Sequence, residues 1–70
     1  MNRYVRVYSA NSGWINYEEA NAFCVEDSHL LIQKLEGIYD LIAINIAAFP
    51  PGLWYQALLV NKDDNDPVSV

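Results

Sequence analysis

Two apolar runs near the end of the chain most constrain what it can fold into. Residues 39–48 and 53–61 are each long enough for a strand, and both carry apolar side chains on both faces. Pro51-Gly52 between them favours a turn with glycine in the left-handed position. We therefore expect Tyr39–Ala48 and Leu53–Asn61 to pair as a C-terminal hairpin. In a chain of 70 residues, other parts of the protein have to cover two apolar faces.

The N-terminal segment predicts a third strand. Residues 3–8 (RYVRVY) alternate and are rich in valine and tyrosine. Val5 and Val7 are expected on one face, and Tyr4, Arg6 and Tyr8 on the other. Residues 9–13 (SANSG) have the composition of a turn.

The middle of the chain favours a helical segment from Asn16 to Glu36. Asn16 can cap its first turn, and Gly37 can end it in a left-handed conformation. A break near Asp27 stays open, because Asp27 or Ser28 could cap a second helix. The residues at helical spacing are Ala20, Phe23, Cys24, Asp27, Leu31 and Leu35.

These elements predict an α+β fold. The expected domain, residues 1–62, is a small two-layer β-α-β-β unit with a three-stranded sheet and one helical layer. Residues 63–70 are expected to form an acidic, frayed tail. The first strand could lie at the edge beside the second strand or beside the third.

A single helical layer covers only one face of a sheet, so the second face is expected to bind another protein surface. The row Ile42, Ile44 and Ile46 is assigned to the helix side, and Asn45 and Gln56 to the outer side. A second copy of the chain is the simplest partner, which predicts a homodimer. Two alternatives stay open: a broken helix that covers both faces, or a tail folded back through Val68 and Val70. The expected self-association residues are Tyr4, Tyr8, Leu41, Trp54, Leu58 and Val60.

The composition argues against stabilisation by a disulfide or a zinc ion, and also against several functions. One cysteine and one histidine allow neither an intrachain disulfide nor a four-ligand zinc site. Nine acidic and four basic residues give a net charge of -5, which argues against direct nucleic-acid binding. No run approaches the roughly 18 apolar residues of a membrane span, and the N-terminus has no signal core. With its free cysteine, the chain is expected in the cytoplasm.

No group of residues predicts catalysis. Cys24, Asp27 and His29 are the sole cluster of catalytic residue types, and on a helix Cys24 and His29 would not share a face. Residues 63–66 (DDND) lack the glycine and closing glutamate of a calcium loop. We therefore expect neither an enzyme nor a bound cofactor or metal.

The resulting hypothesis is a small acidic, non-enzymatic protein-interaction module. A sharper version is an inhibitor or regulator that engages a basic nucleic-acid-binding protein, of the kind that phages and mobile elements encode. The alternative is a domain that binds single-stranded nucleic acid or a small ligand through the aromatic residues Tyr4, Tyr8 and Trp54. The expected partner-binding acidic residues are Glu18, Glu19, Glu26, Asp27, Glu36 and Asp40.

Overall fold

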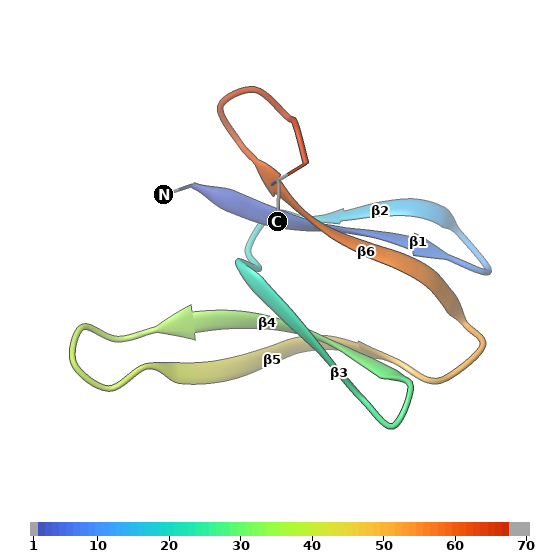
Figure 1. Cartoon of the computed structure of the whole chain (residues 1–70), viewed down its shortest axis with the longest axis horizontal. Helices are drawn as coiled ribbons and strands as arrows, with labels where there is room; N and C mark the ends of the chain where they lie inside the picture. The colour runs from blue at the N-terminus through green and yellow to red at the C-terminus, as the bar shows by residue number, and fades with distance from the viewer. Residues whose placement is uncertain (1, 68–70) are drawn as a thin grey trace.

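The protein is all-β. The computed structural model describes residues 2–67, and within that range it contains six strands and no helix (Figure 1). The predicted α+β fold with a helical layer is therefore wrong. The strands are β1 (Arg3–Ser9), β2 (Gly13–Tyr17), β3 (Ala22–Glu26), β4 (His29–Glu36), β5 (Ile42–Phe49) and β6 (Trp54–Asn61).

The strands form two three-stranded antiparallel sheets that face each other. One sheet has the order β2-β1-β6 and the other has the order β3-β4-β5 (Figure 1). Val5 and Val7 of β1 and Leu30 and Ile32 of β4 are fully buried in one cluster. The central strand of each sheet thus supplies the core, and each sheet covers the apolar face of the other.

The N-terminal predictions are confirmed. β1 begins at Arg3, and Val5 and Val7 face the core. The segment after it turns at residues 10–12, where the hydroxyl of Ser9 accepts a hydrogen bond from the backbone N–H of Ser12 at 2.9 Å. Gly13 adopts the left-handed φ of 69° that the turn requires.

Residues 16–36, where a helix was predicted, form the end of β2, the strands β3 and β4, and the turns between them. Asn16 lies in β2, and β3 and β4 pair as a hairpin with Glu26 opposite His29. Asp27 and Ser28 form the two-residue turn, and both have positive φ, 49° and 64°. Two consecutive positive φ values define a type I′ turn, whose twist matches that of the flanking strands. The residues interpreted as a helix cap therefore end one strand and begin the next.

β5 and β6 do not form the predicted hairpin. β5 pairs with β4 and β6 pairs with β1, so the linker between them crosses from one sheet to the other. The expected turn itself is confirmed: Gly52 has φ 85°, and the N–H of Leu53 donates to the carbonyl of Pro50 at 3.2 Å. A turn of this kind reverses the chain without requiring that its two flanking strands pair. The first strand does lie beside the last one, but in a sheet that excludes β5.

The first apolar run packs differently from the expected arrangement. Of the isoleucine row on β5, Ile46 packs against the core while Ile42 and Ile44 are exposed. The segment after β6 folds back, with Pro67 bridged to Val60 and the hydroxyl of Tyr4 donating to Oδ1 of Asn65 at 3.2 Å. Residues 68–70, including Val68 and Val70, lie outside the described residues.

Candidate functional site

The most exposed apolar region is the hairpin that joins β4 and β5. We call residues 35–44 the β4–β5 arm. In Figure 1 its turn lies at one end of the long axis and extends past the ends of the other strands. Exposed fractions are 90% for Ile38, 95% for Tyr39, 68% for Leu41 and 63% for Ile42, and Leu35 and Ile44 are also exposed. The arm therefore presents six large apolar side chains to solvent.

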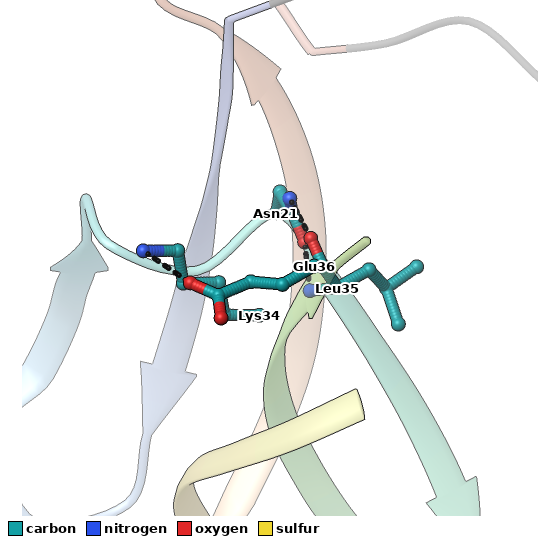
Figure 2. A network of polar contacts seen from close by, with 4 residues as sticks. All are labelled: Asn21, Lys34, Leu35 and Glu36. Atoms are coloured by element: carbon teal, nitrogen blue, oxygen red, sulfur yellow. Dashed lines mark hydrogen bonds and ion pairs between the residues drawn. The ribbon is translucent and has the colours of Figure 1, made fainter. Parts of the chain in front are cut away.

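The arm is held at its base by hydrogen bonds and an ion pair (Figure 2). The side chain of Asn21 accepts a hydrogen bond from the N–H of Leu35 at 2.8 Å and donates one to its carbonyl at 3.2 Å. Lys34 forms an ion pair with Glu36, with 3.0 Å between Nζ and Oε1. Asn21 thus extends the pairing of β3 with β4 by one position, because its side-chain amide forms hydrogen bonds with the backbone of β4 as a neighbouring strand would.

The outer edge of β5 continues this exposed surface. β5 is eight residues long, contains no charged residue or proline, and has β4 as its one strand neighbour in the described sheet. A bulge at Ile46 separates Ile42–Asn45 from the half of the strand that packs on the core. The exposed half of β5 thus combines free backbone hydrogen-bonding groups with apolar side chains.

A second surface lies on the outer face of the β2-β1-β6 sheet. Tyr8 stacks on Trp14 with 4.9 Å between ring centroids, and Tyr55 lies 5.5 Å from Tyr8. Beside these rings is an open depression of about 350 Å³ lined by Arg6, Trp14, Asn16 and Leu58. We call the residues Arg6, Tyr8, Trp14, Asn16, Tyr55 and Leu58 the aromatic face.

The structure divides the six predicted self-association residues among different environments. Tyr4 and Val60 lie opposite each other on the outer face of their sheet, and both are buried. Trp54 is partly buried against the core, and its indole N–H donates to the carbonyl of Ser28 at 3.1 Å. Of the remaining three, the exposed Tyr8 and the half-buried Leu58 belong to the aromatic face, and the exposed Leu41 belongs to the β4–β5 arm.

The predicted acidic residues lie in or beside three turns. Glu18 and Glu19 follow β2, Glu26 and Asp27 lie at the turn between β3 and β4, and Glu36 and Asp40 lie on the β4–β5 arm. Figure 1 shows the last two of these turns at opposite ends of their sheet. The six carboxylates therefore do not form one continuous surface.

Cys24, Asp27 and His29 all lie in the β3–β4 hairpin, and no hydrogen bond joins their side chains. Nδ1 of His29 lies 3.1 Å from the backbone carbonyl of Asp27, and Cys24 is a free, partly buried thiol opposite Leu31. Among residues 2–67, no cluster of three histidine, cysteine or carboxylate side chains could hold a metal ion. In the same range, no helix could cross a membrane.

Of the β4–β5 arm, the sequence predictions named Glu36, Asp40 and Leu41. They missed the two most exposed residues of the arm and also missed Trp14. Gly37 was interpreted as a helix end and Tyr39 as the start of a buried strand, so Ile38 and Tyr39 were not considered as surface residues. One pattern in the sequence could have indicated the arm. Apolar residues lie before Gly37 and after Asp40, and glycine and aspartate are typical turn residues. That pattern fits a hairpin whose two strands are apolar up to the turn.

Comparison with known proteins gives no matching family model, no matching curated protein and no matching solved structure. The surfaces of the chain itself are therefore the basis for a functional proposal.

Proposed function

We propose that this chain is a non-enzymatic protein-interaction module that pairs with a second copy of itself through the β4–β5 arm and the edge of β5. The observation that carries the proposal is the exposure of six large apolar side chains on one projecting hairpin. Soluble monomers rarely expose a contiguous apolar patch of this kind, and such patches mark protein contacts. A single free cysteine favours the cytoplasm as the place where the module acts.

The edge of β5 is the least protected edge of the two sheets. β2 and β3 are five residues long, and the end of β6 is covered by the bridge from Val60 to Pro67. Natural proteins protect a free edge with charges, prolines or short strands, and β5 has none of these. Strand addition at this edge satisfies its free backbone groups and buries the neighbouring apolar side chains together.

A second copy is the partner that fits this edge best. Antiparallel pairing of two β5 strands across a two-fold axis presents the same uncharged surface from each side. It also directs the two hairpin turns in opposite directions, which keeps the Asp40 carboxylates of the two copies apart. Each copy carries a net charge of -5, so a contact without charged side chains adds the least like-charge repulsion between the two copies.

The inhibitor version of the hypothesis has less support. Binding to a basic site requires a continuous acidic surface, and the six predicted carboxylates lie in or beside separate turns. One of them, Glu36, is already paired with Lys34.

The mass in solution tests the proposal. Light scattering coupled to gel filtration at micromolar concentration should give twice the chain mass of 8.0 kDa. Leu41→Glu should shift the protein to the monomer, because it places a charge in the apolar contact. Leu53→Glu, a matched change of an exposed leucine outside the β4–β5 arm, should leave the dimer intact. Circular dichroism checks that both variants are folded.

Amide hydrogen exchange tests the use of the edge. Amides of Ile42–Asn45 that do not pair with β4 should gain protection as protein concentration rises. An 8.0 kDa species at every concentration, or equal effects of the two glutamate variants, would contradict the proposal. A mass that grows without limit would also contradict it, since it indicates an open polymer.

A further inference from the structure

We propose that the aromatic face binds a small planar aromatic anion of the nucleotide class, with its ring on Trp14 and its anionic group on Arg6. This site is independent of the β4–β5 arm, because it lies on the outer side of the other sheet. Three observations carry it: a fixed arginine, exposed aromatic rings and a depression between them.

The guanidinium of Arg6 is held in place by neutral groups. Nε donates to Oδ1 of Asn16 at 3.1 Å, and Nη2 donates to the hydroxyl of Tyr4 at 2.7 Å. The guanidinium also lies over the Tyr4 ring, 5.6 Å from its centroid. Tyr4 is itself anchored by its hydrogen bond to Asn65. Arg6 is therefore positioned before any ligand arrives, which lowers the entropy cost of binding.

Arg6 has no acidic partner in the part of the chain that the structure describes. Although the chain carries nine acidic residues, none of those in residues 2–67 forms an ion pair with Arg6, and Glu36 pairs with Lys34. Within the same residues, Nη1 of Arg6 donates to no protein group. A partly buried arginine that lines a depression favours an anion, and the planar guanidinium suits phosphate or carboxylate.

The neighbouring rings supply the second part of the site. Trp14 is 51% exposed, is stacked on Tyr8 and also lines the depression. An exposed indole offers a surface on which a nucleobase stacks, worth about 1–3 kcal/mol per base. The amides of Asn16 and Gln56 lie on the same face and can hydrogen-bond to the edge of a base.

Size and charge favour a single nucleotide unit. The depression of about 350 Å³ is at the lower end of the range for small-ligand pockets. A long polyanion would be repelled by the net charge of -5, whereas one phosphate meets Arg6 at short range. The unit can be a free nucleotide or the phosphorylated end of a short oligonucleotide, since both present a base beside a terminal phosphate.

Nuclear magnetic resonance of the full chain provides the test. The chain has two indole N–H signals, and that of Trp54 is an internal reference because it is hydrogen-bonded to Ser28. Titration with adenosine monophosphate should shift the Trp14 signal and leave the Trp54 signal in place. Adenosine, which lacks the phosphate, should bind at least tenfold more weakly. A 5′-phosphorylated oligonucleotide that binds more tightly than the mononucleotide would identify a strand end as the source, and weaker binding would identify the free nucleotide.

Variants separate the site from general attraction between charges. Arg6→Gln and Trp14→Leu should each weaken binding of adenosine monophosphate about tenfold or more. Lys62→Gln removes the same charge from an exposed residue outside the aromatic face, and it should change binding less than about twofold. The proposal is overturned if millimolar adenosine monophosphate shifts neither indole signal or shifts both equally. Equal effects of Arg6→Gln and Lys62→Gln, or equal affinities for adenosine and its monophosphate, would also overturn it.

Discussion

At the scale of single residues, the side chain of Asn21 determines how the β4–β5 arm is held. Its amide both accepts from and donates to the backbone of Leu35. Asn21→Asp keeps the acceptor but loses the donor, and it brings a carboxylate against the Leu35 carbonyl. We expect a loss of about 1 kcal/mol in the free energy of unfolding, measured by urea titration.

Asn11→Asp is the matched control for this change. Asn11 is exposed in the turn between β1 and β2, so the same change of charge there should alter stability by less than about 0.5 kcal/mol. Equal losses for the two variants would mean that added negative charge, and not the contact with Leu35, destabilises the protein.

The partly buried phenol of Tyr17 is expected to lower the stability of the protein in alkaline solution. Burial raises the pKa of its phenol above the usual value of 10.0, and its ring packs edge-on against Phe49. A pKa that is higher in the folded state than in the unfolded state contributes stability below pH 10.0, and this contribution is lost as the pH rises through the folded-state pKa. Tyr17→Phe should therefore reduce the fall in stability between pH 9 and 11.

The measurement compares urea unfolding at both pH values. Tyr39→Phe is the control, because Tyr39 is almost fully exposed. This variant should have the same pH dependence of stability as the unmodified chain. If Tyr17→Phe also leaves it unchanged, burial of the Tyr17 phenol does not contribute to alkaline unfolding.

At the scale of the elements, the turn of the β4–β5 arm depends on Gly37. Its φ of 125° is rarely open to a residue with a Cβ, and a methyl group there would overlap the carbonyl oxygen of Asp40. We expect Gly37→Ala to lower the free energy of unfolding by about 2 kcal/mol or to disorder the turn. Urea unfolding and amide exchange of residues 35–44 measure the two effects.

Gly13→Ala is the comparison for this prediction. Gly13 has φ 69°, in the ordinary left-handed region, and nothing lies within 4 Å of a Cβ built there. Its cost should be about 1 kcal/mol. A cost as large as that of Gly37→Ala would show that positive φ alone, without the overlap with Asp40, explains both losses.

The sequence predicted the strands and turns correctly where the residue pattern fits only one type of secondary structure. The alternation in residues 3–8 predicts β1, and the two apolar runs predict strands that overlap β5 and β6. Pro51-Gly52 predicts the turn between those runs. The helix prediction for residues 22–36 was wrong because Phe23, Leu31 and Leu35 fit a helical spacing. In the structure, Phe23 and Ile32 pair across one face of a hairpin. Asp27-Ser28 lacks the glycine typical of a type I′ turn, so the turn was not recognised.

The candidate surfaces were less predictable than the strands. The prediction of an uncovered apolar face assumed that all strands belong to one sheet, whereas the strands divide between two sheets that face each other. Which apolar residues remain outside depends on where β5 leaves the core, at the bulge beside Ile46. That bulge arises from the pairing of β4 with β5, which no local pattern in either strand indicates.

At the scale of the whole molecule, stability depends on the contact between the two sheets. Ile32 and Ile42 test this, because they lie on adjacent strands but Ile32 is fully buried and Ile42 is mostly exposed. Ile32→Val should cost about 1 kcal/mol by leaving a small cavity. Ile42→Val should change stability by less than about 0.5 kcal/mol.

Tryptophan fluorescence at submicromolar protein concentration follows the unfolding of both variants. Dilution matters because Ile42 belongs to the proposed dimer contact, and a dissociated chain reports the fold alone. Equal losses for the two variants under these conditions would place the stabilising contact outside the space between the sheets.

The pairing of the first strand with the last one affects how the chain folds during its synthesis. Arg3 pairs with Asn61, so β1 cannot pair with β6 until nearly the whole described chain has left the ribosome. Before that point the first sheet is a two-stranded hairpin, which is marginally stable at best in water, and the apolar side of β4 has little to pack against. Folding therefore has to follow the emergence of β6, and the uncharged β5 strand is already exposed to other nascent chains during that interval.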